Sequence, residues 1–263
     1  MAWREKYGPW ALVTGASSGL GAEFVRQLAA RGLNIVLAAR RKERMDVLAD
    51  RVGQAHSVRT RVIPVDLTAE GGCNRLIEET HALEIGLLIN NAGYGLSGQY
   101  HALDPDRQVD MTVLNCVVPV LLTNHYLPLM LDRGRGGLIF LASTAAYQPT
   151  PYLGTYGATK AFNLMLGECL WREYRKMGVD SLALSPGFTR TEFTRIANIE
   201  DAGPFREATP QDVVATALRT LGKRPSVVHG LLNKILTFSV RILPRRTVIA
   251  ITGAALKGRT RTA

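Results

Sequence analysis

A tyrosine and a lysine four residues apart, Tyr156 and Lys160, form the pattern in this sequence that is best suited to acid–base chemistry. In a helix this spacing places both side chains on one face, one turn apart. A free phenol, with a pKa of about 10, is a poor acid or base at neutral pH, but a nearby ammonium group stabilises its phenolate. Such a tyrosine can exchange a proton with a carbonyl or alcohol oxygen. The same spacing also occurs in surface pairs that do no chemistry.

Ser143 lies thirteen residues before Tyr156, at the end of the apolar run Leu138–Ala142. That run predicts a buried strand, and open α/β sheets bind their ligands beyond the carboxyl ends of the strands. The Ser143 hydroxyl could therefore reach a substrate oxygen near Tyr156. A lone serine in this position could instead cap a helix or stabilise a turn.

A glycine-rich loop follows the first apolar run, Trp10–Thr14, and precedes an alanine-rich segment of helical period. Glycines let the backbone turn sharply and bring its N–H groups close to a pyrophosphate at a helix N-terminus. The spacing is G-x-x-x-G-x-G, and the order of strand, turn and helix indicates a dinucleotide site rather than an ordinary tight turn. The residues expected to contact the cofactor here are Gly15, Ser17, Ser18, Gly19, Leu20 and Gly21.

Two arginines at the end of the second predicted strand indicate which dinucleotide binds. In dinucleotide sites an acid at this point accepts hydrogen bonds from the ribose 2′-hydroxyl, whereas an arginine pairs with a 2′-phosphate. The sequence here is Ala38-Ala39-Arg40-Arg41-Lys42 and contains no acid. We therefore expect NADP(H), bound mainly by Arg40 with Arg41 as a helper. The alternative is that both arginines only begin a solvated basic helix.

Short apolar runs alternate with longer segments of helical period along most of the chain. Strands that are apolar on both faces and joined by helices are typical of right-handed βαβ units in a parallel sheet. We therefore predict an α/β fold of the Rossmann type, a doubly wound sheet of about seven strands with helices on both faces. The expected strands are 10–14, 34–39, 61–65, 85–90, 138–142, 180–184 and, weakly, 226–229, and the expected helices are 20–31, 42–52, 70–82, 106–132, 156–176 and 210–222.

The sequence contains further motifs besides the glycine loop, Ser143 and the Tyr156/Lys160 pair, and all of them occur in order along the chain. They are Asp66-Leu67, Asn90-Asn91-Ala92-Gly93, Asn115 and Pro186-Gly187. Each motif alone is weak, but together they make residues 8–195 resemble the short-chain dehydrogenase/reductase family.

The resemblance implies a role for each catalytic position. Tyr156 would donate a proton to the carbonyl during reduction and accept one during oxidation. Lys160 would lower the Tyr156 pKa and hold the nicotinamide ribose hydroxyls, while the nicotinamide itself supplies the hydride. Ser143 would hydrogen-bond the substrate oxygen, and Asn115 would hold a water of the proton relay. Asn115 could instead be a buried polar residue that satisfies backbone groups, because it lies in an apolar segment.

The resemblance also implies further cofactor contacts. Asp66 and Leu67 would meet the adenine, and Asn91 would lie along the dinucleotide. The remaining contacts would be Ala92 and Gly93 after the fourth strand and, after the sixth, Pro186, Gly187, the backbone of Thr189 and the hydroxyl of Thr191.

The segment 192–208 has mixed polarity, and the resemblance implies that it is a mobile lid over the substrate. No arginine suited to a carboxylate can be assigned, so we expect a largely apolar carbonyl or secondary alcohol substrate. Each side chain expected in the substrate pocket could instead serve packing alone. Besides Ser143, these side chains are Tyr147, Gln148, Tyr152 and Phe193.

The net charge of +10 is concentrated at the carboxyl end of the chain. Residues 1–212 contain 22 basic and 22 acidic side chains, whereas residues 213–263 contain ten basic side chains and no acidic one. We predict an NADP-binding domain at 1–224, which includes the lid, and an extension at 225–263 with the last strand and a basic amphipathic helix ended by Pro244. The extension could pack on the domain or on a second subunit, lie on an anionic membrane through residues 229–263, or dock an acidic carrier protein.

Composition excludes several other classes of protein. Apolar residues make up 46% and charged residues 21%, the balance of a globular domain rather than of a disordered chain. Three scattered cysteines, without histidines at ligand spacing, indicate neither disulfides nor a metal site. We identify no secretory signal and no spanning apolar run, so we expect a cytoplasmic location, with the membrane surface as an alternative. Basic residues without interleaved aromatics do not indicate nucleic acid.

The leading hypothesis is an NADP(H)-dependent oxidoreductase that interconverts a ketone and a secondary alcohol on a hydrophobic, lipid-like or steroid-like molecule. A second hypothesis is a 3-oxoacyl thioester reductase acting on acyl carrier protein or coenzyme A substrates. A third is a non-catalytic protein that senses a dinucleotide. The resemblance also implies a homodimer or homotetramer with interfaces at the long helices 106–132 and 156–176.

Overall fold

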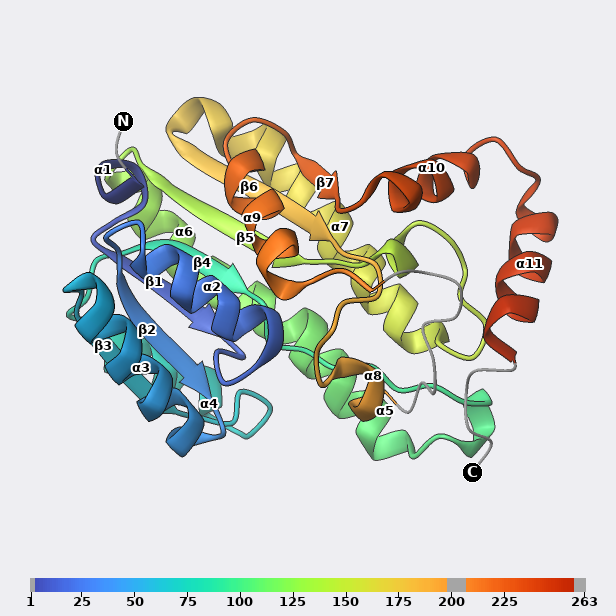
Figure 1. The fold of residues 1–263 in the computed structure, drawn as a ribbon, viewed down its shortest axis with the longest axis horizontal. Helices are drawn as coiled ribbons and strands as arrows, with labels where there is room; N and C mark the ends of the chain where they lie inside the picture. The colour runs from blue at the N-terminus through green and yellow to red at the C-terminus, as the bar shows by residue number, and fades with distance from the viewer. Residues whose placement is uncertain (1–2, 198–206, 258–263) are drawn as a thin grey trace.

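Seven parallel strands form one twisted sheet in the order β3-β2-β1-β4-β5-β6-β7 (Figure 1). The structure, a computed structural model, describes residues 3–197 and 207–257. The strand order reverses between β1 and β4, which confirms the predicted Rossmann-type fold. Each strand lies within two residues of its expected position. The bounds are β1 (Trp10–Thr14), β2 (Asn34–Ala39), β3 (Thr60–Pro64), β4 (Ile85–Asn90), β5 (Gly136–Leu141), β6 (Val179–Ser185) and β7 (Ser226–Val228).

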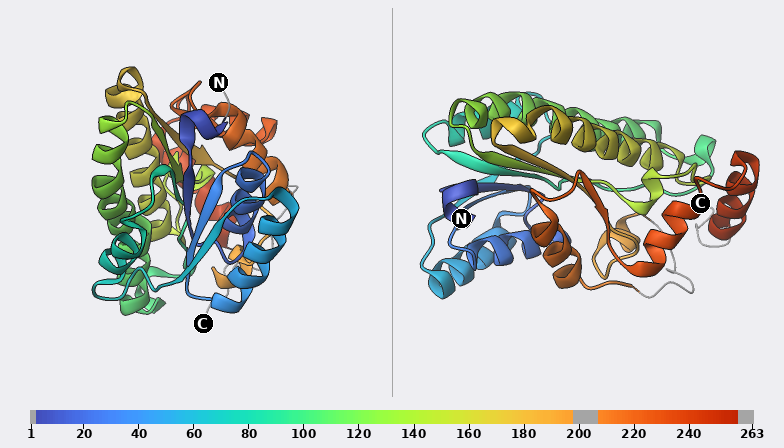
Figure 2. Two further views of the ribbon diagram at one scale, coloured as in Figure 1. Left: turned by 90° about the vertical axis from the view of Figure 1, so that its left-hand side faces the viewer. Right: turned by 90° about the horizontal axis from the view of Figure 1, so that it is seen from above.

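Helices cover both faces of the sheet (Figure 2). One layer contains α2 (Gly19–Ala29), α3 (Lys42–His56) and α9 (Pro210–Thr220), and the other contains α4 (Gly72–Thr80), α6 (Val118–Asp132) and α7 (Gly154–Tyr174). Successive strand residues point to opposite faces. In β1, Ala11 and Val13 therefore pack in the core with α2, α3 and α9, whereas Leu12 packs in the core with α4 and α6. This two-sided burial explains why the strands read as continuous apolar runs.

The predicted helix 106–132 is continuous from residue 105 to residue 132 but changes its pitch. It comprises α5 (Pro105–Thr112), a π-helical turn at Val113–Val117, and α6. Among the described residues it is the one helix long and apolar enough to cross a membrane, with 28 residues and an 18-residue window of mean hydropathy 1.4. The sequence pattern did not reveal this because polar residues interrupt the apolar run. Leu122, Tyr126 and other residues on its buried side pack against the sheet, as in the core helix of a globular domain.

Two helices, α10 (Leu231–Ser239) and α11 (Arg245–Lys257), extend beyond the carboxyl ends of the strands (Figures 1 and 2). The prediction of a single helix ended by Pro244 is wrong, because the first helix ends at Ser239 and Pro244 precedes the second. Proline is favoured at a helix start, where its missing N–H is not needed. The Pro244 carbonyl accepts a hydrogen bond from the Val248 N–H at 3.2 Å.

The predicted lid at 192–208 is described only at its two ends, since residues 198–206 lie outside the described residues. It begins with the short helix α8 (Phe193–Ile196), which the sequence did not predict; nor did it predict the N-terminal helix α1 (Trp3–Tyr7). At the far end Ala208 pairs with Thr189. Both ends of the lid therefore attach to the segment that leaves β6, beside the site.

Candidate active site

A cavity of about 870 Å³ lies at the carboxyl ends of the strands. It begins at the loop between β1 and α2, passes the ends of β4, β5 and β6, and reaches α10 and α11. The predicted site residues line this cavity, with the exceptions of Gly21, Asn115, Tyr147 and Tyr152.

Glycines shape the loop between β1 and α2. Gly19 has a φ of +54°, a backbone conformation that L side chains rarely adopt. A Cβ atom on Gly21 would lie 2.2 Å from the Gly15 carbonyl oxygen, so the loop closes only with glycine there. Ser18 is the N-cap of α2 but makes no side-chain hydrogen bond to the helix. Ser18, Gly19 and Leu20 line the cavity, so the first-turn N–H groups that the Ser18 side chain leaves uncapped suit a pyrophosphate there.

Thr14 and Asn91 tie the end of β1 to the end of β4. The Thr14 hydroxyl accepts hydrogen bonds from the backbone N–H groups of Asn91 and Ala92, both at 3.0 Å. The Asn91 side chain donates to the Thr14 carbonyl at 2.7 Å. These contacts hold Asn91 and Ala92 at the point where the strand order reverses, which is where such sheets bind dinucleotides.

Arg41, rather than Arg40, lies against the glycine loop. Its Nε and Nη2 donate to the hydroxyls of Ser17 and Ser18 at 3.2 and 2.6 Å. The Arg40 side chain is 77% exposed, and its Nη1 lies 3.7 Å from the Asp66 carboxylate. Both arginines line the cavity. Arg41 contacts the glycine loop directly and Arg40 does not, and the expectation that Arg40 is the main partner of a 2′-phosphate stays a prediction.

Glu192 connects Arg41 to the segment that follows β6. Its carboxylate accepts hydrogen bonds from Nη1 of Arg41 and from Nη1 of Arg44, each at 2.8 Å. Hydrogen bonds from Arg44 and Arg41 lower the Glu192 pKa to about 2, so this carboxylate is ionised at neutral pH. No sequence signal identified Glu192, because its partners lie 148 and 151 residues away in the chain.

Asp66 and Leu67 follow β3 and line the end of the cavity where the adenine is expected to bind. Burial alone raises the Asp66 pKa. Its carboxylate accepts hydrogen bonds from the Thr68 N–H at 3.0 Å and from the Thr68 hydroxyl at 2.8 Å. Together with the charge of Arg40, these hydrogen bonds outweigh burial and lower the Asp66 pKa. Asp66 therefore stays ionised and stabilises its own turn.

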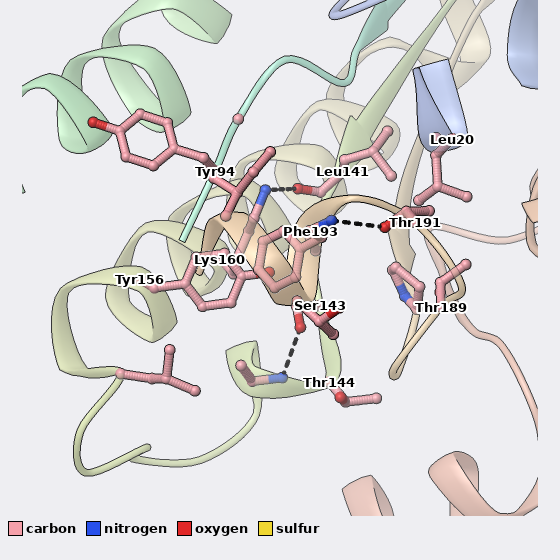
Figure 3. A pocket seen from close by; sticks show the side chains of 18 of the residues that line it. Leu20, Tyr94, Leu141, Ser143, Thr144, Tyr156, Lys160, Thr189, Thr191 and Phe193 are labelled. Carbon is pink, nitrogen blue, oxygen red and sulfur yellow. Dashed lines mark hydrogen bonds between the residues drawn. The ribbon is translucent and has the colours of Figure 1, made fainter. Parts of the chain in front are cut away.

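Ser143, Tyr156 and Lys160 point into one part of the cavity (Figure 3). Tyr156 and Lys160 lie in the first turns of α7 and are both buried, which excludes a surface pair. The Lys160 Nζ lies 5.7 Å from the centre of the Tyr156 ring and donates to the Leu141 carbonyl at 2.8 Å. Ser143 follows β5 and accepts a hydrogen bond from the Ala145 N–H at 3.1 Å, and its hydroxyl is close enough to Tyr156 to lower the pKa of that phenol.

Burial favours the neutral form of both titratable groups. It raises the Tyr156 pKa to about 12, against a lowering effect of the Ser143 hydrogen bond, and it lowers the Lys160 pKa to about 8. The structure does not show the predicted lowering of the Tyr156 pKa by Lys160, whose ammonium group donates to the Leu141 carbonyl instead. At neutral pH Tyr156 is therefore protonated and Lys160 is mostly charged, the state needed to donate a proton to a carbonyl.

Asn115 lies in the π-helical turn and is buried. Its amide donates to the Tyr94 carbonyl at 3.0 Å and to the Thr159 hydroxyl at 2.9 Å, and its Oδ1 accepts from the Tyr94 N–H at 3.2 Å. Its own carbonyl accepts from the Asn163 side chain at 2.7 Å. Asn115 thus holds the loop after β4 against α7, and a role in binding a relay water stays a prediction.

The segment that follows β6 borders the cavity beside the glycine loop. The Pro186 carbonyl accepts a hydrogen bond from the Thr144 N–H at 2.9 Å. A Cβ atom on Gly19 would lie 3.1 Å from Thr191 Cγ2, so Thr191 lies directly beside the loop. The Thr191 hydroxyl accepts from the Phe193 N–H at 3.2 Å (Figure 3). This segment therefore borders the region where the pyrophosphate is expected.

Two of the four further residues predicted for the substrate pocket face the cavity. The Phe193 ring packs on the Tyr156 ring, with 5.3 Å between their centres. The Gln148 Oε1 is buried and has no hydrogen-bond partner among the described residues. Tyr147 instead packs with the buried residues of β6 and α7, and Tyr152 takes a φ of +67° in the turn before α7. The path of this turn keeps both tyrosines out of the lining of the cavity, and the spacing of the residues in the sequence did not reveal that path.

Two helices that the sequence placed outside the chemistry, α10 and α11, form the far wall of the cavity. In α11, apolar side chains recur at intervals of three and four residues, a helical signal that could have been recognised. The wall residues are Asn233, Leu236, Thr237 and Ser239 from α10, Val240 and Leu243 from the segment between the helices, and Val248, Ile251, Thr252, Ala255 and Leu256 from α11.

Comparison with known proteins agrees with this arrangement. The short chain dehydrogenase family profile matches residues 9–201, most of the chain. The chain belongs to the short-chain dehydrogenase family. The match covers the glycine loop and the Ser143, Tyr156 and Lys160 positions, and it confirms the resemblance drawn from the motifs.

Several relatives of this short-chain dehydrogenase align along most of their length. A 7beta-hydroxysteroid dehydrogenase from Collinsella aerofaciens is 32% identical over 240 residues, which cover 89% of this chain and 90% of that protein. A very-long-chain 3-oxoacyl-CoA reductase from Anas platyrhynchos is 31% identical over 247 residues, which cover 92% and 78%.

Solved structures share the fold of this dehydrogenase. A 7beta-hydroxysteroid dehydrogenase superposes with a TM-score of 0.88 at 29% identity, over 96% of this chain and 100% of that one. A short-chain dehydrogenase from Sphingobium yanoikuyae in complex with NADPH superposes with a TM-score of 0.79 at 30% identity, over 89% and 94%.

Proposed function

We propose that this dehydrogenase uses NADP(H) to interconvert a ketone and a secondary alcohol on a hydrophobic, steroid-like or lipid-like molecule. The observation that carries the proposal is the position of Tyr156, whose protonated phenol lies with Ser143 and Lys160 between the glycine loop and an apolar wall. The relatives from Collinsella and Anas act on a hydroxysteroid and on a very-long-chain 3-oxoacyl-CoA, which supports a large apolar substrate.

The residues at the cofactor end of the cavity fit NADP(H). Gly19 and Gly21 allow the close backbone approach that a pyrophosphate needs, and the N-terminus of α2 faces it. Arg41 and Arg40 supply guanidinium groups for a 2′-phosphate, and no acid lies at the end of β2. The NADPH complex of the Sphingobium relative supports the same choice.

Proton transfer is the part of the reaction that the protein itself performs. When bound, the nicotinamide supplies or accepts the hydride. During reduction Tyr156 donates its proton to the carbonyl oxygen, which the Ser143 hydroxyl holds in place. Burial dominates the Tyr156 pKa, but the Lys160 charge lies 5.7 Å from the centre of the Tyr156 ring and offsets part of the cost of the phenolate that this step leaves behind. Burial raises the Tyr156 pKa to about 12 and so keeps the phenol protonated at neutral pH, which is the form that donates a proton during reduction.

The substrate end of the cavity combines an apolar wall with one unused polar group. Leu236, Val240 and Val248 belong to the wall, while the Gln148 Oε1 is a buried acceptor without a partner. A buried acceptor is costly to leave unpaired. A substrate hydroxyl or amide N–H that donates to Gln148 would therefore orient an otherwise apolar molecule.

Two alternatives remain candidates. Reduction of a 3-oxoacyl thioester is supported by the Anas relative and by the basic residues near α10 and α11, where an acidic carrier or coenzyme A could bind. A protein that only senses the dinucleotide has no need of the Ser143, Tyr156 and Lys160 arrangement, so turnover is the better proposal.

Consumption of NADPH in the presence of chosen ketones tests the proposal. We expect bulky steroid ketones to be reduced with NADPH in clear preference to NADH, and the alcohol product to appear in equal amount. Preference for 3-oxoacyl thioesters over steroid ketones would select the second candidate. NADPH binding without turnover of either class would select the sensing protein.

We also propose a cytoplasmic homodimer or homotetramer. Exposed apolar side chains on the long helices support it, since α6 carries Leu121 and Leu129 and α7 carries Phe162 and Met165. Light scattering on the purified protein should give two or four subunits, and a Met165→Glu variant should dissociate. A monomeric wild-type protein would contradict the proposal.

A further inference from the structure

The outward surface of α10 is apolar. Leu231, Ile235 and Phe238 recur at intervals of four and three residues, on one face of the helix, and are 74%, 57% and 60% exposed. Ile242 and Ile249 continue the exposed apolar surface towards and along α11. The opposite face, which includes the buried Thr237, turns to the domain. This arrangement reverses that of an ordinary surface helix, whose apolar face is buried.

The charged residues of α10, of α11 and of the segment between them are all basic. Lys234, Arg241, Arg245 and Arg246 are exposed, and residues 213–263 contain no acidic side chain. The ion pairs found among the described residues all lie elsewhere. The positive charge of this surface is therefore not neutralised within the described part of the chain.

The inner faces of the same helices line the cavity through residues such as Leu236 and Val248. Both helices stand beyond the carboxyl ends of the strands, away from the layers that cover the sheet (Figures 1 and 2). A flat partner could therefore contact their outer faces without meeting the sheet or its helical layers.

We propose that α10 and α11 form a surface that binds anionic lipid bilayers. An apolar helix face surrounded by arginine and lysine is the combination that places a helix in the headgroup region of such a bilayer. A second copy of the chain is a poorer occupant, because a symmetric contact would bring two equally basic surfaces together. The bilayer would then lie beside the α10 and α11 wall of the cavity, so that the enzyme would work next to a store of apolar molecules.

Sedimentation of the full chain with lipid vesicles tests this proposal. We expect binding to phosphatidylcholine vesicles that contain phosphatidylglycerol and little binding to phosphatidylcholine alone. Raising the salt from about 0.1 M to about 1 M shortens the Debye length from about 10 Å to about 3 Å and should release much of the protein.

Two sets of substitutions separate the charged part from the apolar part. Replacing Arg241, Arg245 and Arg246 by glutamine should weaken vesicle binding roughly a hundredfold, because each basic residue near the surface contributes about fivefold. Replacing Leu231, Ile235 and Phe238 by serine should weaken binding by at least about tenfold and leave a more salt-sensitive remainder. None of these six residues lines the cavity, so NADPH affinity should not change.

Matched controls use exposed residues elsewhere on the molecule. Val47 and Met177 are 52% and 53% exposed, and their replacement by serine should leave vesicle binding unchanged. Glutamine at the exposed positions Arg51, Arg172 and Lys176 should likewise have little effect. Equal losses in the control variants, or no binding of wild-type protein to anionic vesicles, would overturn the proposal. A change of subunit number in the α10 variants would assign the surface to a second copy instead. If the wild-type protein and its variants bind vesicles as expected but none of them is catalytically active, that result would contradict the proposed function and not the lipid-binding surface.

Discussion

Replacing Arg41 by alanine should weaken the binding of NADPH far more than that of NADH. Arg41 lies within 3.2 Å of the Ser17 hydroxyl and 2.6 Å of the Ser18 hydroxyl, at the loop that would hold the cofactor phosphates. A hydrogen bond to a charged group contributes about 1.5 to 3 kcal/mol. Loss of one such contact with a 2′-phosphate corresponds to an increase of about 10- to 150-fold in Kd.

Arg40 should matter less than Arg41. Its side chain is 77% exposed and its carboxylate partner lies 3.7 Å away, and exposed ion pairs contribute about 0.2 to 1 kcal/mol. Replacing Arg40 by alanine should therefore raise the NADPH Kd by at most about fivefold.

Arg44 supplies the matched control, because it binds Glu192 at the same 2.8 Å as Arg41 but does not line the cavity. Fluorescence titrations with NADPH and NADH at one ionic strength would measure all three variants. Equal losses for the two cofactors in Arg41→Ala, or a larger NADPH loss in Arg40→Ala, would refute the assignment of the 2′-phosphate to Arg41.

Three further predictions concern the lid, the proton donor and the far wall. Glu192→Gln removes a carboxylate that competes with a 2′-phosphate for Arg41, so it should tighten NADPH binding by up to about fivefold without affecting NADH binding. Weaker NADPH binding would show that Glu192 supports the site. Because Lys160 loses its charge as the pH rises through about 8 while Tyr156 stays protonated up to about 12, NADPH-dependent reduction should decline above about pH 8 in a pH–rate profile. A rate that stays level to about pH 10 would remove Lys160 from the proton-transfer step. Val248→Ala enlarges the cavity at its far wall and should change the KM for a bulky ketone by about tenfold with NADPH affinity unchanged. Equal changes in the KM and in the NADPH affinity would show that Val248 supports the cofactor site or the stability of the fold.

Most of the sheet could be predicted from the sequence because the strands inside it are buried on both faces. Runs such as Asn34–Ala39 and Ile85–Asn90 contain few polar residues, so their positions were evident and the observed bounds agree. The carboxyl end of the chain was harder. The sequence predicts that Pro244 ends a helix, whereas it precedes one, and a proline alone does not distinguish the two positions.

The glycine loop and the Tyr156/Lys160 pair could also be predicted, because their members lie close together in the chain. Contacts between distant segments could not. The Glu192–Arg41 ion pair has no signature at short range, and neither has the contact of α10 and α11 with the cavity. The direction of the Tyr156 pKa depends on how deeply the ring is buried and on where the Lys160 ammonium donates its hydrogen bond, which spacing alone does not determine.

A Tyr156→Phe variant tests the proton-donor assignment most directly, because it removes one hydroxyl and keeps the ring that packs on Phe193. Turnover and NADPH affinity would be measured with a ketone that the wild-type protein reduces, beside a Tyr100→Phe control whose side chain is 73% exposed. We predict that Tyr156→Phe loses at least about a hundredfold in kcat and keeps its NADPH affinity. The Tyr100→Phe control should remain fully active. A Tyr156→Phe protein that reduces the ketone at the wild-type rate would contradict the role of Tyr156 as the proton donor.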